Sequence, residues 1–108
     1  MVFEDLPLLW APVGSERVGF ILEDGELVEV ENVCPEPEEG FEVRGEDLVE
    51  YAERAVASWH THPGASANLS TDDYIGFVNH PKLKHYIVGS DGVRAYVVKG
   101  NKVLNADG

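Results

Sequence analysis

Residues 55–80, AVASWHTHPGASANLSTDDYIGFVNH, decide how this chain is expected to fold. Residues 55–62 are mostly apolar and read as a strand, which Pro63 and Gly64 would end. A loop of small residues follows, and Ser70 is placed as the N-cap of a short helix over residues 71–80. The stretch therefore predicts a strand, a loop and a helix in direct succession.

The sequence on either side predicts further strands and one more helix. Residues 17–33, RVGFILEDGELVEVENV, read as a hairpin that turns at Asp24-Gly25. Residues 45–57 read as a helix whose core face would carry residues at helical spacing, namely Leu48, Val49, Ala52, Ala55 and Val56. Residues 85–105 read as a second hairpin region. This order predicts an α/β layered domain with a mixed sheet.

Length and composition restrict the class of protein. A chain of 108 residues predicts a single domain, 1–108. The net charge of −12 argues against binding to nucleic acid or to an anionic membrane, because both are themselves negative. Cys34 is the single cysteine, so no internal disulfide can form. With neither a signal peptide nor an apolar run of membrane-spanning length in the sequence, a cytoplasmic location is expected.

Two histidines lie two positions apart on the predicted strand. Strand alternation places Ser58, His60 and His62 on one face, with a spacing of about 6.6 Å between the two histidines. Both imidazoles could lean onto one ion, and Asp73, one turn into the next helix, could supply a third ligand. Two histidines, a carboxylate and one open position are typical of a catalytic zinc site.

A zinc hydrolase also needs an acid that carries protons without binding the metal. Spacing alone does not choose among the glutamates at the first hairpin, which are Glu16, Glu23, Glu29 and Glu31. A carbonyl oxygen that becomes negative needs a hydrogen-bond donor, and Ser70, three residues before Asp73, is placed to act as one.

The cluster resembles the signature of the JAMM (MPN+, Mov34/PAD-1) metallopeptidases. That signature is His-x-His-Pro followed, after seven residues from the second histidine, by Ser-x-x-Asp. The matching positions in this chain are His60, His62, Pro63, Ser70 and Asp73. The family also has an upstream Glu-x-x-Gly before apolar residues, and ERVGFIL at residues 16–22 fits it, so the resemblance selects Glu16 among the glutamates.

The resemblance implies a fold and a set of roles. The fold would be a deaminase-like three-layer α/β domain, with a mixed β-sheet flanked by helices. His60, His62 and Asp73 would bind Zn²⁺, Glu16 would move a proton from water to the leaving amine, and Ser70 would stabilise the oxyanion. The implied activity is hydrolysis of a peptide or isopeptide bond in a protein or peptide substrate.

A narrower resemblance concerns the substrate. Residues 28–43, VEVENVCPEPEEGFEV, are similar to a passage of JAMM domains in phage tail-assembly proteins and related bacterial peptidases. A ubiquitin-like C-terminal tail, a phage tail component and a cell-wall peptide all stay open as substrates. MPN domains often pair, so a homodimer is one expected state, although the sequence gives no interface signal.

Other interpretations of the same residues compete with this one. A non-catalytic MPN scaffold would bind partners only, but such scaffolds usually lack a metal ligand. Amidohydrolases need a longer barrel, and non-haem iron oxygenases space their ligands differently. Outside the cluster, Trp59 is expected in the core, Trp10 either in the core or in an exposed contact, and His80 and His85 in solvent. Cys34, in an acidic loop, is expected to be inert.

Overall fold

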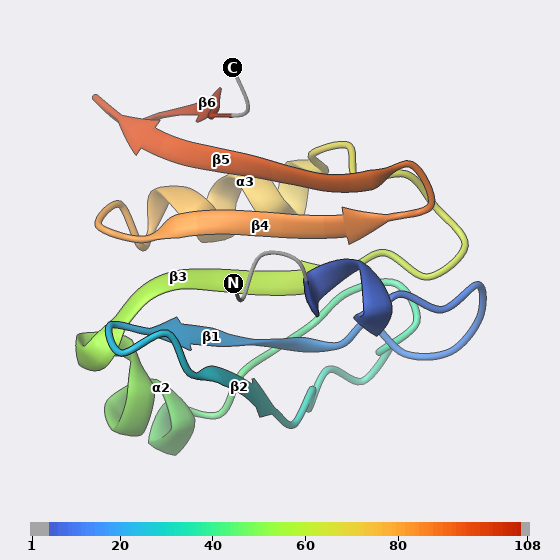
Figure 1. Cartoon of the computed structure of the whole chain (residues 1–108), viewed down its shortest axis with the longest axis horizontal. Coiled ribbons are helices and arrows are strands. Elements are labelled where there is room, and N and C mark those ends of the chain that lie inside the picture. Colours follow the sequence, from blue (N-terminus) through green and yellow to red (C-terminus); the bar gives the residue numbers. More distant parts are fainter. Residues whose placement is uncertain (1–4, 107–108) are drawn as a thin grey trace.

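A six-stranded mixed sheet runs through the centre of the molecule in this computed structural model, which describes residues 5–106 (Figure 1). The strand order is β2-β1-β3-β4-β5-β6. The strands are β1 (Val18–Leu22), β2 (Leu27–Val30), β3 (Ala55–Thr61), β4 (Lys84–Gly89), β5 (Gly92–Lys99) and β6 (Lys102–Asn105). The helices are α2 (Gly45–Tyr51) and α3 (Thr71–Val78), with short 3-10 turns η1 (Leu6–Leu9) and η2 (Ala52–Arg54). The predicted α/β class and mixed sheet are confirmed.

The centre of the sheet is where its direction changes. β3 pairs antiparallel with β1, placing Val18 opposite His60, and parallel with β4, placing Ser58 opposite His85. A parallel pair needs a crossover, and α3 with the loop before it supplies that connection. The end of β3 and the start of α3 are therefore held next to each other.

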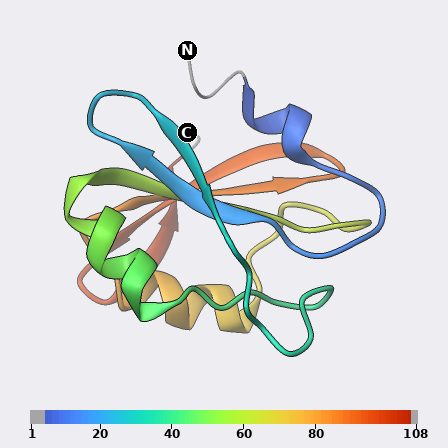
Figure 2. The same cartoon turned by 90° about the horizontal axis from the view of Figure 1, so that it is seen from below.

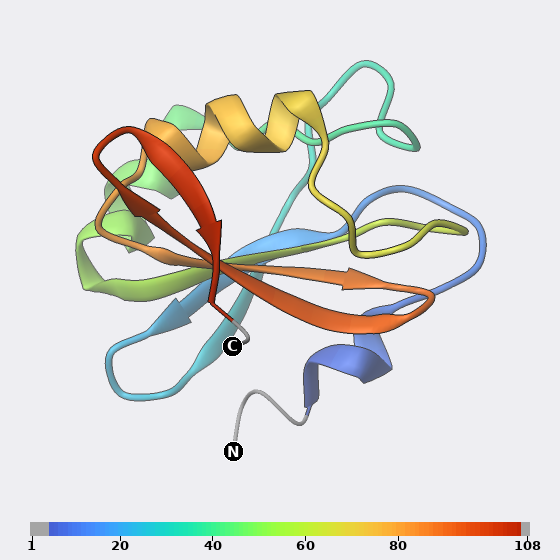
Figure 3. The ribbon, with the colours of Figure 1, turned by 90° about the horizontal axis from the view of Figure 1, so that it is seen from above.

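The two faces of the sheet carry different layers. Both α-helices cover one face, and η1 lies against the other (Figures 2 and 3). The η1 face packs around the fully buried Leu6 and Trp59. The helix face packs around Phe20 on the α2 side and around Phe77 and Ile87 on the α3 side. Trp59 is in the core, as the strand alternation predicted.

The helix predicted over residues 45–57 is shorter in the structure. α2 ends at Tyr51, η2 adds one turn, and β3 already begins at Ala55. Val49 is 83% exposed and Val56 50% exposed, so the predicted core face is wrong at both positions. Val56 belongs to the strand β3. Its neighbours Ala55 and Ala57 are compatible with either a helix or a strand, so the sequence pattern did not decide between them. The helix predicted over residues 71–80 also ends early, at Val78.

The ends of the predicted domain extend past the described part of the chain. The prediction of one domain over 1–108 includes residues 1–4 and 107–108, which lie outside the described residues. Within residues 5–106, no helix combines the length and the apolar character that crossing a bilayer requires.

Candidate metal centre

The predicted ligands meet where β3 leads into α3. His60 is the penultimate residue of β3 and His62 follows its end, so both side chains leave the same face of the sheet. Asp73 comes from the first turn of α3, across the loop of residues 63–70. Gly89 lets this loop lie close to β4, because a Cβ there would be 2.2 Å from the Ala67 amide nitrogen.

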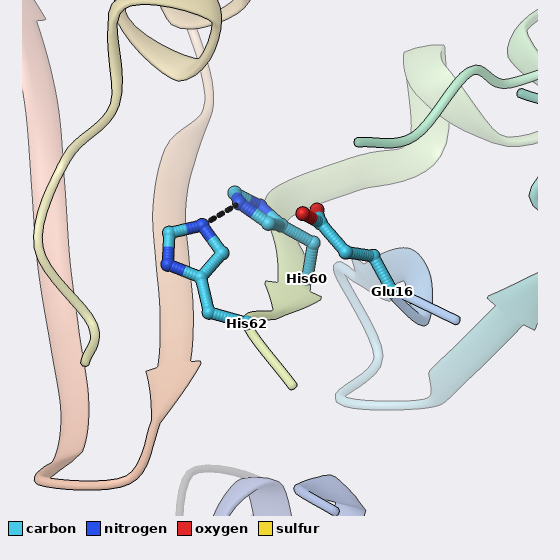
Figure 4. A group of neighbouring side chains, drawn as sticks. All are labelled: Glu16, His60 and His62. Atoms are coloured by element: carbon cyan, nitrogen blue, oxygen red, sulfur yellow. Dashed lines mark hydrogen bonds between the residues drawn. The ribbon is translucent and has the colours of Figure 1, made fainter. Parts of the chain in front are cut away.

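Each pair among the three predicted ligands brings two polar atoms to hydrogen-bond distance. The Nε2 atoms of His60 and His62 are 3.1 Å apart (Figure 4). Asp73 places Oδ1 3.1 Å from His60 Nε2 and Oδ2 3.0 Å from His62 Nε2. Ligands bound tetrahedrally at zinc distances would be about 3.3 Å apart. The three predicted ligands are therefore brought together within hydrogen-bond distance, and their side chains are of the types that bind zinc.

Burial and hydrogen bonds act in opposition on the protonation of the three groups. Burial lowers the pKa of His60, which is 1% exposed, and so favours the neutral imidazole that metals bind. Burial also opposes the negative charge of Asp73, but hydrogen bonds with both imidazoles outweigh it and hold the pKa of this carboxyl far below its usual range. For His62, burial is outweighed by hydrogen bonds with Asp73 and the Ser66 carbonyl, so its pKa is raised.

The orientation of His62 is fixed from outside the cluster. Its Nδ1 lies 2.8 Å from the Ser66 carbonyl oxygen, which can only accept a hydrogen bond. Nδ1 therefore carries a proton, and only loss of the second proton, which Nε2 donates to the Asp73 carboxylate, would leave Nε2 free to bind a metal. Trp10, half-buried against the η1 side of the sheet, donates from Nε1 to the His62 carbonyl oxygen at 2.8 Å.

Glu16 is the glutamate that reaches this cluster. Donor atoms of Glu16, His60 and His62 all lie within 4.8 Å of one another, and the Glu16 carboxyl group lies beside the His60 ring (Figure 4). Burial raises the pKa of Glu16 to about 7, with the His62 charge opposing and the Asp73 charge adding to the shift. Glu29 and Glu31 form exposed ion pairs with Arg17 and Arg44 instead.

Ser70 and Asp73 form a capping box at the start of α3. The Asp73 amide donates to Ser70 Oγ at 3.1 Å, and the Ser70 amide donates to Asp73 Oδ2 at 3.4 Å. The cap points the Asp73 side chain back toward β3, whereas Asp72, the rival ligand, is exposed. The N-cap role predicted for Ser70 is confirmed.

His85 is a polar core residue, so the prediction that it lies in solvent is wrong. It is 2% exposed, its ring stacks on Phe77 with centroids 4.1 Å apart, and its Nδ1 lies 2.5 Å from Ser58 Oγ. The other ring nitrogen donates to the His80 carbonyl oxygen at 3.0 Å. Strand alternation was the available signal, because it puts His85 on the same side of β4 as the buried Ile87. His80 is exposed, as predicted.

An apolar cavity of about 180 Å³ lies beside the cluster, on the helix-covered face of the sheet. Its walls include Phe41 and Phe77, whose ring centroids are 4.6 and 6.0 Å from that of His60. Ser58 and His85 form part of its lining and hydrogen-bond to each other. The cavity therefore borders the cluster of predicted ligands on its apolar side, and Glu16, His62 and Asp73 are not part of its lining.

Comparison with known proteins gives a likeness of fold. No protein-family profile and no curated protein matches the chain. A solution structure of protein DSY2949 from Desulfitobacterium hafniense is similar, with a TM-score of 0.63 and 16% sequence identity. The match covers 96% of this chain and 79% of that one. At this identity the likeness shows a shared fold alone.

Proposed function

We propose that this chain is a zinc-dependent metallopeptidase of the JAMM type, which hydrolyses a peptide or isopeptide bond. The observation that carries the proposal is the convergence of His60, His62 and Asp73, with donor atoms 3.0–3.1 Å apart. Two imidazoles and one carboxylate are a donor set that zinc takes in hydrolytic sites. The family's three-layer, deaminase-like architecture is part of the proposal, and the helices on one face and η1 on the other are compatible with it.

Zinc would supply the part of the chemistry that the side chains cannot, since a bound ion lowers the pKa of water and polarises a carbonyl group. Glu16 acts as the proton carrier, taking a proton at its carboxylate and delivering it to the leaving amine. Its pKa of about 7 suits this role, because a general base works best when its pKa is near the working pH. Glu16 is buried and lies next to both histidines, so it can exchange protons with the reacting atoms directly and not through bulk solvent.

Ser70 is the proposed donor to the oxyanion. Its Oγ accepts the capping hydrogen bond from the Asp73 amide, which leaves its own hydroxyl hydrogen to be donated. The N-terminus of α3 adds a partial positive charge on the same side. Ser70 therefore favours negative charge on a carbonyl oxygen bound beside the metal ligands.

The substrate class follows from the resemblance, and the chain's charge fits part of it. A ubiquitin-like tail or a phage tail component presents the extended peptide that such a peptidase cleaves. The net charge of −12 and the exposed Glu36, Glu38 and Glu39 on the loop that follows β2 favour a neutral or basic peptide. A cytoplasmic site of action belongs to the same proposal, and the single, unpaired Cys34 suits a reducing compartment.

The decisive experiment combines metal content with turnover. Purified native chain should contain about one zinc ion and cleave a diglycine–lysine isopeptide reporter in an EDTA-sensitive manner. Glu16→Gln should keep the zinc and lose turnover, and Glu23→Gln, at an exposed residue, is the matched control. A metal-free protein that EDTA does not affect would overturn the peptidase proposal and favour the non-catalytic scaffold.

A further inference from the structure

Asn32 lies just after β2 and joins the loop of residues 31–42 into one unit. Its Nδ2 donates to the carbonyl oxygens of Glu16 at 2.9 Å and Gly40 at 3.0 Å. Its Oδ1 accepts from the amides of Cys34 at 3.0 Å and Glu42 at 3.1 Å. Both ends of one half-buried amide group are therefore fully used, which is typical of a residue that fixes a loop rather than one that faces solvent.

This loop holds the backbone of Glu16 on both of its polar atoms. The Glu16 amide donates to the Pro37 carbonyl oxygen at 2.6 Å, and the Glu16 carbonyl oxygen accepts from Asn32. Glu16 lies before β1, so the sheet does not pair these two groups. The loop crosses to the helix side of the sheet and lies near the start of α3 (Figures 2 and 3).

The next residue, Arg17, is tied to the ligand strand. Its amide donates to Thr61 Oγ1 at 2.9 Å, and its carbonyl oxygen accepts from the Thr61 amide at 2.9 Å. Thr61 stands between the two metal-binding histidines. Glu16 is therefore held between a fixed point on β3 and the Asn32-centred loop, and the loop sets where its carboxyl group lies relative to the imidazoles.

We propose that Asn32 is a positioning residue for Glu16, which holds the proton-carrying carboxyl group in register with the metal ligands. The inference rests on the proposed function of Glu16. Asn32 hydrogen-bonds to none of His60, His62 and Asp73. Its loss therefore affects the placement of Glu16 and spares metal binding.

The test compares Asn32→Asp and Asn32→Ala with the native chain. Asn32→Asp keeps the acceptor for Cys34 and Glu42 and loses the donor to Glu16, so it retains half of the loop closure if Asn32→Ala fails to fold. Val103→Ala, on β6 away from the site, is the control for a general loss of stability. The measurements are zinc affinity, turnover of the isopeptide reporter, and hydrogen exchange of the Glu16 amide.

We expect Asn32→Asp to lower kcat at least about tenfold, with KM and zinc affinity within about threefold of native. Exchange of the Glu16 amide should accelerate at least about tenfold, while the Thr61 amide keeps its protection. In a Glu16→Gln background, Asn32→Asp should change the low residual kcat less than about twofold, because a residue that acts through Glu16 has nothing left to position.

Three results would overturn the inference. They are an unchanged exchange rate at Glu16, a loss of zinc affinity that accompanies the loss of turnover, and an equal effect of Asn32→Asp with or without Glu16. Failure of the proposed function would look different, because the native chain itself would then bind no zinc or cleave no substrate. In that case the exchange rate at Glu16 still decides whether Asn32 holds its backbone.

Discussion

Asp73 contacts both histidines of the cluster at once, with one carboxylate oxygen 3.1 Å from His60 Nε2 and the other 3.0 Å from His62 Nε2. This relationship depends on the capping box, which fixes the Asp73 backbone at the start of α3. Asp73 is thus both a member of the helix cap and a proposed metal ligand. Folding of α3 therefore also completes the cluster.

Asp73→Asn should weaken zinc binding at least about a hundredfold, because it removes the negative charge and one strong donor from the cluster. The matched control is Asp72→Asn, which changes the same charge at the neighbouring exposed position and should leave the affinity unchanged. Competition with a chromophoric chelator measures both. Equal effects of the two substitutions would mean that only general charge matters.

Ser70→Ala should have two separable effects. Loss of the N-cap should cost about 1 kcal/mol of stability, and loss of the oxyanion donor should lower kcat about a hundredfold. Ser70→Thr keeps the cap and the hydroxyl and should restore most of both. Urea unfolding and reporter kinetics check these values. If the loss of turnover in Ser70→Ala is no larger than its loss of stability explains, Ser70 has the capping role alone.

The buried His85 should make the fold sensitive to acid. Burial lowers the pKa of His85 to about 4, while in the unfolded chain it has the ordinary value of 6.5. The unfolded chain thus binds a proton first, and the contribution of His85 to stability is complete above pH 6.5 and lost as pH falls toward 4. Between pH 7.5 and 5 the loss should be about 2 kcal/mol.

To measure this loss, the free energy of unfolding is determined at both pH values for the native chain and for His85→Gln, with metal removed by chelation. The change between the two pH values is then compared between the two proteins. His80→Gln is the control, since the His80 side chain is exposed and only its carbonyl oxygen contacts His85. An identical pH dependence of His85→Gln and the native chain would contradict the assignment of the acid sensitivity to His85.

Gly19, the glycine of the Glu-x-x-Gly passage, should not tolerate a side chain. A Cβ there would lie 1.9 Å from the Val28 carbonyl oxygen and 2.7 Å from Trp59 Nε1. Gly19→Ala should therefore destabilise the fold by about 1–3 kcal/mol. Gly76→Ala, in α3 with nothing within 4 Å of its added Cβ, should instead stabilise it by up to about 1 kcal/mol. Thermal unfolding of both variants gives the comparison, and a neutral Gly19→Ala would show that β2 or Trp59 moves away easily.

Local patterns in the sequence were enough to predict the parts of the site that lie close together in the chain. Strand alternation placed His60 and His62 on one face and Trp59 on the other, and the Ser-x-x-Asp spacing predicted the cap. Glu16 was selected by the family resemblance, and the structure brings it to the same cluster. These features depend on the alternation of side chains along a strand and on hydrogen bonds between residues close in sequence. Both can be inferred from the order of the residues.

Features that depend on long-range packing were not predicted. His85 is buried because Ser58, on the parallel strand, and the His80 carbonyl oxygen satisfy both of its ring nitrogens. Val49 is exposed because α2 packs Leu48 and Tyr51 against the sheet, which leaves Val49 on the solvent side of the helix. Asn32 contacts Glu16 across sixteen positions. In each case the deciding neighbour is remote in sequence, so no local pattern indicates it.

The most direct test of the proposed centre is a zinc titration of the native chain and of His62→Ala at pH 7.5, measured by isothermal titration calorimetry. The account predicts about one zinc ion per native chain, bound with a Kd below about 1 µM, and at least about a hundredfold weaker binding in the variant. Absence of zinc binding by the native chain, or equal affinity in His62→Ala, would contradict it.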